Sequence, residues 1–205
     1  MKTYIIGPSH IDNCFLEQIQ TEIDNETLFK NCIFDSYVGI PNWSRNIETQ
    51  ILEKMNNHNI VWLVSDYKFN NHEYEKVIEL EKNNELFLDT LGFHNNVRPE
   101  MQRHFHMETL GKHSLRVIDH IIKICPNIKL IFWCLYTRSR VNRSSYPEYL
   151  WYNTIKEKYK NNIIDIDAFT NPKDFEMGIQ DSGGHPNKKG YELMSRMIES
   201  AFPTR

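Results

Sequence analysis

The sequence predicts an α/β fold, a three-layer α/β/α sandwich built on a five-stranded parallel sheet. Short apolar runs alternate along the chain with longer segments of helical period, which is the pattern of a doubly wound sheet. A length of 205 residues with 40% hydrophobic residues suits one domain with a substantial core. We therefore expect a single domain over residues 1–205.

Five apolar runs are the candidate strands, and five segments of helical period lie between or after them. The strands are expected at Thr3–Gly7, Cys32–Tyr37, Ile60–Val64, Ile128–Leu135 and Ile163–Ile166. The helices are expected at Ile11–Ile23, Ser44–Asn56, about Arg98–Ile124, Pro147–Tyr159 and Asn187–Ala201. The stretch from about 70 to 124 is too long for a structureless crossover, so we expect a helical insertion there that forms a lid or a partner surface.

Charge and hydropathy argue against two classes of partner. The formal charge of −3, the pI near 6.3 and the lack of a Lys/Arg block argue against nucleic acid. No apolar run approaches membrane-spanning length, and Met1-Lys2 leads into the first strand without a hydrophobic leader. We expect no membrane association and a cytoplasmic location, while the sequence leaves the oligomeric state open.

The cysteines and histidines show no metal-binding pattern. Cys14, Cys32, Cys125 and Cys134 lack a CxxC pair, so we interpret them as reduced thiols of the core. The histidines at 94, 104, 106 and 113 lack ligand spacing and suit a solvated surface. We expect neither a metal ion nor a cofactor.

Two motifs at opposite ends of the chain carry the chemistry. Gly7-Pro8-Ser9-His10 closes the first apolar run, and Asp181-Ser182-Gly183-Gly184-His185-Pro186 precedes the last helix. A serine hydroxyl becomes a nucleophile when a base takes its proton, and the rim of a parallel sheet could bring Ser9 and His185 together. The motifs therefore indicate acyl transfer. Another interpretation makes Ser9 the N-cap of the helix that begins near Ile11. If Ser9 is instead the nucleophile, we expect its neighbour His10 to line the mouth of the substrate pocket.

These stretches resemble the first and last blocks of the SGNH (GDSL-like) hydrolase superfamily. Two further blocks follow in the same order: Val38–Ser44 resembles the second and Leu63–Asn71 the third. The resemblance spans nearly the whole chain. It implies a flavodoxin-like three-layer fold and an acyl-serine mechanism.

The resemblance also implies a role for each matched residue. Ser9 would be the nucleophile, His185 the general base and then acid, and Asp181 the orienting carboxylate. The oxyanion hole would use Ser9, Gly39 and either Asn71, which we favour, or Asn70. Asp181 stands four residues before His185 where the family has three, so a triad and a Ser-His dyad both stay open.

Residues near the same rim are candidates for substrate binding. Arg138, Arg140 and Arg143 follow the fourth predicted strand, where arginines either bind an anionic group or lie in a solvated loop. Tyr67 follows the third strand and could stack on a sugar ring or pack in the core.

The predicted activity is that of a serine-dependent ester hydrolase or O-acyltransferase. By analogy with small proteins of this type, the substrate is a carbohydrate ester or an acceptor sugar of bacterial surface-polysaccharide metabolism. The alternative is an SGNH-fold binding or assembly protein that lost catalysis. Three differences from the family pattern favour it: Pro8 replaces the usual Asp, Ser65 stands about where the third block has Gly, and Asp181 lies one residue too far from His185. A nucleotide-binding domain is the weakest reading, because no GxGxxG or GxxxxGK follows a strand.

Overall fold

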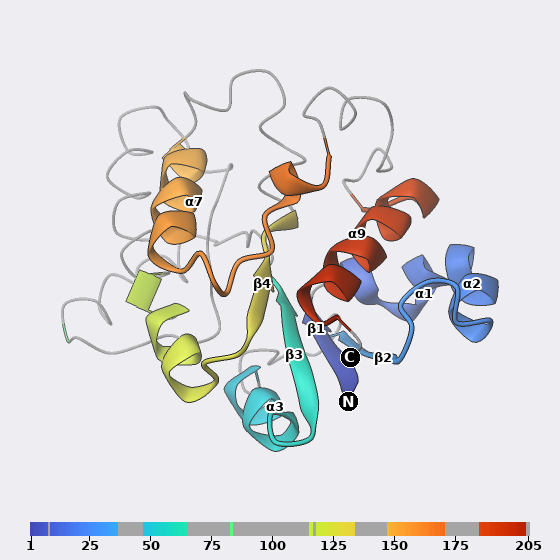
Figure 1. Ribbon diagram of the computed structural model, residues 1–205, viewed down its shortest axis with the longest axis horizontal. Coiled ribbons are helices and arrows are strands. Elements are labelled where there is room, and N and C mark those ends of the chain that lie inside the picture. The colour runs from blue at the N-terminus through green and yellow to red at the C-terminus, as the bar shows by residue number, and fades with distance from the viewer. Residues whose placement is uncertain are drawn as a thin grey trace.

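The computed structural model describes residues 1–7, 9–36, 47–64, 83, 115–116, 118–133, 147–170 and 185–203. Strands and helices alternate in these ranges (Figure 1). In chain order the elements are β1 (Lys2–Gly7), η1 (Ser9–Ile11), α1 (Asn13–Leu16), η2 (Glu17–Ile19), α2 (Gln20–Asp24), β2 (Cys32–Ser36), α3 (Ile47–Lys54), β3 (His58–Leu63), β4 (Lys129–Ile131), α7 (Pro147–Lys158), η5 (Ile166–Ala168) and α9 (Lys188–Ala201). Residues 118–124 form a further helical segment before β4.

The strands form one parallel sheet in the order β2-β1-β3-β4, which confirms the predicted α/β class. Ile5 at the centre of β1 pairs with Phe34 of β2 on one side and Val61 of β3 on the other. The chain moves outward from β1 to β2 and then crosses back to β3. In such a sheet the carboxyl ends of the two strands at this reversal form the usual ligand site, here the ends of β1 and β3.

The prediction of five strands is wrong for the described residues, which form a 4-stranded sheet. Where the fifth strand was expected, Ile163 makes an isolated parallel bridge to Leu130. The Leu130 amide donates to the Asn162 carbonyl at 2.7 Å, and the Ile164 amide donates to the Leu130 carbonyl at 3.0 Å. Extension stops there because the Asp165 carboxylate accepts from the Asp167 amide at 3.3 Å and caps η5.

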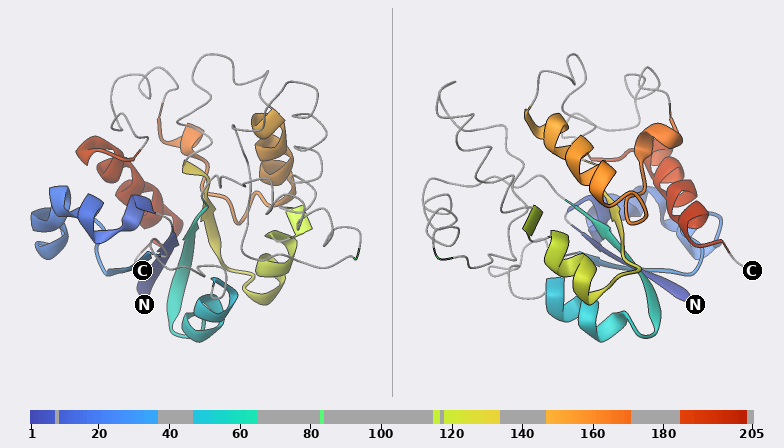
Figure 2. Two further views of the ribbon diagram at one scale, coloured as in Figure 1. Left: turned by 180° about the vertical axis from the view of Figure 1, so that it is seen from behind. Right: turned by 60° about the vertical axis from the view of Figure 1, so that its left-hand side comes forward.

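The helices cover the two faces of the sheet. Parallel crossovers are right-handed, so the connections from β1 to β2 and from β2 back to β3 lie on opposite faces. Figure 2 shows α3 and segment 118–124 on one side of the strands and α1, α2 and α9 on the other. The arrangement is compatible with a three-layer α/β/α sandwich.

Polar contacts join the helices that share the α3 face. His120 of segment 118–124 lies 3.1 Å from the Glu48 carboxylate of α3, and Lys158 of α7 donates to Asp119 at 2.9 Å. Inside this layer, the Tyr4 hydroxyl of β1 donates to the Asp35 carboxylate of β2. Burial and the nearby carboxylate raise the pKa of Tyr4. This network ties β1 and β2 together.

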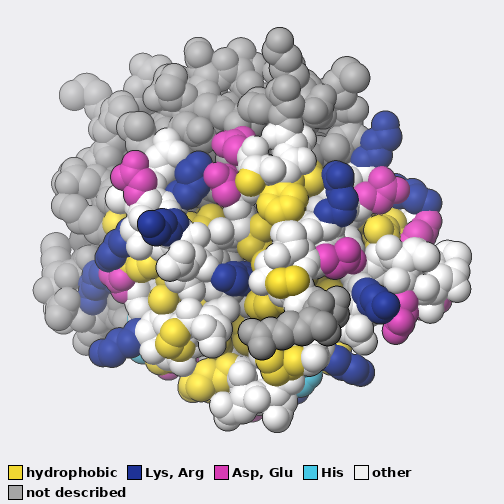
Figure 3. Space-filling model, in the orientation of Figure 1, with side chains coloured by type: hydrophobic (Ala, Val, Ile, Leu, Met, Phe, Trp, Pro, Cys, Tyr) yellow, Lys and Arg dark blue, Asp and Glu magenta, His cyan; other side chains and the backbone are white. Residues whose placement is uncertain are grey.

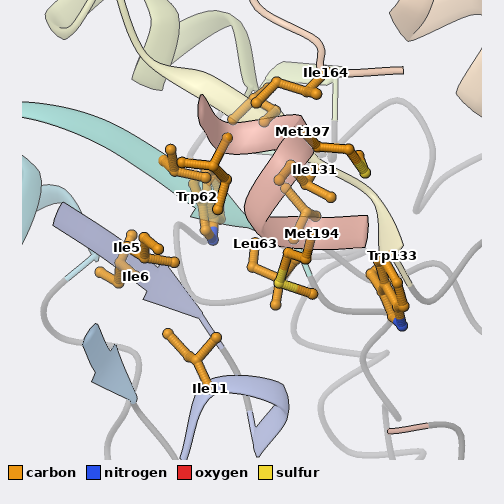
Figure 4. Close-up of a cluster of buried hydrophobic side chains, with 14 of the residues drawn as sticks. Ile5, Ile6, Ile11, Trp62, Leu63, Ile131, Trp133, Ile164, Met194 and Met197 are labelled. Atoms are coloured by element: carbon orange, nitrogen blue, oxygen red, sulfur yellow. The ribbon is translucent and has the colours of Figure 1, made fainter. Parts of the chain in front are cut away.

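The core on the opposite face lies between the sheet and α9. Figure 4 shows Met194 and Met197 of α9 beside Leu63 and Ile131 of the strands, and all four side chains are buried. The buried residues of α9 recur at helical spacing, as expected of an amphipathic helix that packs on a sheet. Asn187 caps this helix by accepting from the Gly190 amide at 3.1 Å.

The predicted helix Ile11–Ile23 is instead a series of short pieces, η1, α1, η2 and α2. Asp12 has extended backbone (φ −71°, ψ 146°), so its side chain can accept from the Cys14 amide at 3.1 Å and start a new helix. Cys14 is exposed in α1, so it is not a core thiol as predicted. Helices α3, α7 and α9 and the helical segment 118–124 lie within their predicted ranges. Most of the 70–124 insertion lies outside the described residues.

The described surface mixes charges of both signs. On the face in Figure 3, Lys and Arg side chains lie among Asp and Glu side chains. In the described part of the chain, no helix has the length and apolar character that crossing a bilayer requires.

Candidate functional site

The first site segment begins where β1 ends. Gly7 is buried against β3, and a Cβ atom added to it would lie 2.8 Å from the Leu63 Cβ and 3.3 Å from the Leu63 carbonyl oxygen. The two strands thus approach more closely at this point than a side chain would allow. Ser9 stands two residues after Gly7 and begins η1. The backbone of Ser9 is therefore held near the carboxyl ends of β1 and β3, where a doubly wound sheet has its ligand site.

The capping interpretation of Ser9 fails for the α-helix that follows. α1 begins at Asn13, and its N-cap is Asp12. Ser9 lies within η1, before that cap. The helix start is therefore satisfied by another residue.

The second site segment ends in His185, which is half-buried immediately before α9. Its imidazole stacks on the Phe15 ring of α1, with ring centroids 3.9 Å apart and an interplanar angle of 13°. The His10 ring lies 5.2 Å from the same imidazole, tilted by 42°. Since His10 is the neighbour of Ser9, the structure brings the first and last motifs together, as predicted.

Three contacts hold the start of α9 against the first segment, beside which it runs in Figure 1. The buried Tyr191 hydroxyl donates to the His10 carbonyl at 2.6 Å. The Gln18 amide donates to the Pro186 carbonyl at 3.2 Å, next to His185. Lys188 pairs with Glu22, which raises the pKa of the lysine and lowers that of the carboxyl. The residues that follow His185 are thus held against the first segment.

Several predicted site residues lie outside the described residues. They are Asp181, Gly39, Asn70, Asn71, Tyr67, Arg138, Arg140 and Arg143. The orienting acid, the other oxyanion donors and the substrate contacts therefore stay predictions. Within the described ranges, no three His, Cys, Asp or Glu side chains gather as a metal site would require.

Sequence reasoning missed two contacts at this site, those of Phe15 and Tyr191. Side chains in a helix lean toward its N-terminus, and the Phe15 side chain of α1 contacts the ring of His185. Tyr191 lies in α9, just after the last motif, and its partner is a backbone carbonyl far away in sequence. His10, expected at the pocket mouth, is buried with 7% of its surface exposed, and its ring lies beside that of His185.

A separate pocket of about 200 Å³ lies at the other end of the sheet. Its lining includes Met55, His58, Ile60 and Cys125. His58 begins β3, so this pocket is at the amino end of the strand. It does not adjoin the Ser9 and His185 segments.

The comparisons with protein-family models, with curated proteins and with solved structures find no match to this chain. The SGNH resemblance therefore rests on the sequence motifs.

Proposed function

We propose that this protein is a serine-dependent ester hydrolase or O-acyltransferase, with Ser9 as nucleophile and His185 as general base. The observation that carries the proposal is the contact between the His10 and His185 rings, whose centroids are 5.2 Å apart. It joins the residue next to Ser9 to the histidine of a motif at the other end of the chain. The position of this contact beyond β1 supports a site at the carboxyl edge of the sheet.

The proposed reaction has two half-reactions. The Ser9 hydroxyl attacks the ester carbonyl carbon while His185 takes the hydroxyl proton, and the imidazolium then gives that proton to the departing alcohol. In the second half, His185 takes a proton from water or from an acceptor hydroxyl, whose oxygen attacks the acyl-serine. The free acid or the new ester leaves, and Ser9 recovers its proton. Hydrolysis and transfer differ only in this acceptor.

We assign the remaining roles from the motif resemblance. Gly39 and either Asn71 or Asn70 would stabilise the oxyanion together with the Ser9 amide. Asp181 would orient His185 if the enzyme uses a triad. With these residues the oxyanion would have hydrogen-bond donors, and in a triad the imidazolium would have a carboxylate partner.

We also propose a carbohydrate ester or acceptor sugar as substrate, in cytoplasmic steps of bacterial surface-polysaccharide metabolism. Tyr67 would stack on the sugar ring, because aromatic faces suit the apolar face of a pyranose. Arg138 and Arg140 would bind a carboxylate or phosphate on the substrate, since guanidinium groups pair with such anions.

The test is hydrolysis of a short neutral acyl ester by Ser9→Ala, His185→Ala and the double variant. We expect each single variant to lose roughly 10³-fold or more in kcat, and the double variant to be no worse, because the two groups act as a unit. Ser200→Ala and His120→Ala are matched controls on the same scaffold. They should retain wild-type turnover.

Two results would contradict the proposal. Wild-type turnover in either site variant would remove that residue from the mechanism. A wild-type protein that binds acylated sugars but turns over no ester would instead support the non-catalytic alternative, which the departures at Pro8 and Ser65 favour.

A further inference from the structure

We propose that Phe15 is the positioning residue for His185: its ring holds the imidazole in place and stabilises the imidazolium that forms during acyl transfer. This inference rests on the proposed function, because it assigns a role within that same site. It adds a residue that lies in neither of the two motifs.

The first support is the geometry of the contact. The Phe15 and His185 rings are nearly parallel, with an angle of 13° and centroids 3.9 Å apart. This is a face-to-face contact, and it covers one face of the imidazole. Rotation of the His185 ring out of this plane would break the contact, so the stack restricts the plane of the ring.

The second support is that Phe15 is not part of the hydrophobic core. It is absent from the buried core, and it is also absent from the half-buried hydrophobic side chains packed against that core among the described residues. Other phenylalanines differ: Phe29 is buried, and Phe202 packs on the core from the end of α9. The ring contact of Phe15 in the described structure is with His185, so its place is explained by the site rather than by the core.

The third support is a hydrogen-bonded bridge that fixes the two residues relative to each other. The Gln18 side-chain amide donates to the Phe15 carbonyl at 3.0 Å and to the Pro186 carbonyl at 3.2 Å. An amide nitrogen has two hydrogens, so one Gln18 side chain can make both bonds. The bridge joins α1 to the residue after His185. The stack is therefore held by backbone as well as by ring contact.

The chemistry follows from the charge on His185 during the reaction. When His185 takes the Ser9 proton, the imidazole becomes a cation, and a cation over an aromatic face is attracted by the ring quadrupole. The attraction is stronger for the imidazolium than for the neutral ring. Phe15 would thus favour the transition state over the ground state, which raises kcat more than it changes KM.

The experiment compares Phe15→Leu, Phe15→Tyr and the control Phe202→Leu on a short neutral ester. Phe202 is half-buried at the far end of α9, so its change tests the same loss of an aromatic ring away from His185. For Phe15→Leu we expect kcat to fall by roughly 3- to 30-fold with KM within about twofold of wild type. Phe15→Tyr, which keeps the aromatic face, should stay within about threefold of wild-type kcat. Thermal unfolding of each variant verifies folding.

A second readout does not depend on turnover. In NMR spectra of the ring-labelled protein, the carbon-bound protons of His185 should lie upfield in wild type and Phe15→Tyr, and move downfield in Phe15→Leu. An unchanged kcat or an unchanged His185 shift in folded Phe15→Leu would overturn the role of Phe15 alone. A wild-type protein that hydrolyses no ester and takes up no fluorophosphonate would refute the proposed function, and the positioning role with it.

Discussion

Replacement of Gly7 by alanine tests how closely the fold and the site are coupled. The φ angle of Gly7 is not left-handed, so the backbone alone would accept alanine. The obstacle is space, because the new Cβ would lie 2.8 Å from the Leu63 Cβ and 3.4 Å from the Ile11 Cδ1. The Leu63 Cβ is fixed to the backbone of β3, so relief requires β1 and β3 to separate.

The expected loss follows from two opposing effects. Overpacking of a filled core costs about 1–3 kcal/mol, while a Gly to Ala change restricts the unfolded chain and returns about 0.4–1 kcal/mol. The net expectation is a loss of about 1–2 kcal/mol in the free energy of unfolding, or about 2–8 °C in Tm for a chain of this size.

Thermal unfolding of Gly7→Ala and Gly7→Val, followed by circular dichroism, measures this loss. The Val variant should be less stable than the Ala variant, because it adds two further carbons at the same contact. Ester turnover should also fall in Gly7→Ala, since Ser9 is two residues away. A Gly7→Ala variant with the Tm of wild type or above would refute the close approach of the strands.

Three further predictions concern the catalytic role of Asp181, the hydrogen bond from Tyr4 to Asp35 and the hydrogen bond from Tyr191 to His10. Asp181→Asn should lower kcat by roughly 10³-fold or more if the site is a triad, and by less than about tenfold if it is a dyad, as steady-state kinetics can decide. Burial and the bond to Asp35 raise the pKa of Tyr4, so the neutral hydroxyl stabilises the folded protein below about pH 10, and this contribution is lost as the pH rises further. In urea titrations the unfolding free energy of wild type should therefore fall above pH 10 relative to Tyr4→Phe, by at most about 1.4 kcal/mol per pH unit; parallel curves would contradict this. Tyr191→Phe should lose about 1–3 kcal/mol in the same assay because the buried His10 carbonyl loses its donor, and a change below about 0.5 kcal/mol would count against that bond.

The sequence predicted those parts of the fold that depend on local pattern. β1 was found because consecutive β-branched and aromatic residues mark a strand buried on both faces. α9 was found because its apolar residues repeat with helical period and Asn187 stands before them as a cap. Both motifs flank these two elements, so their meeting could be predicted as well.

The errors arose where local and long-range interactions compete. Ile163 has the residue type of a strand, but Asp165 caps a 3-10 helix two residues later and ends the extension. The broken helix after β1 follows from Asp12, whose side chain bonds the backbone of the next turn. The stack of Phe15 on His185 joins distant parts of the chain, and no periodicity in either part encodes it.

The most direct test of the central claim is to locate the covalent adduct of a fluorophosphonate probe. Intact mass should show one adduct on the wild-type protein, and peptide mapping should place it on Ser9. The adduct should be absent from Ser9→Ala and form far more slowly on His185→Ala, because the serine has lost its base. An adduct mapped to another residue, or labelling of Ser9→Ala at the wild-type rate, would contradict the assignment of Ser9 as the nucleophile.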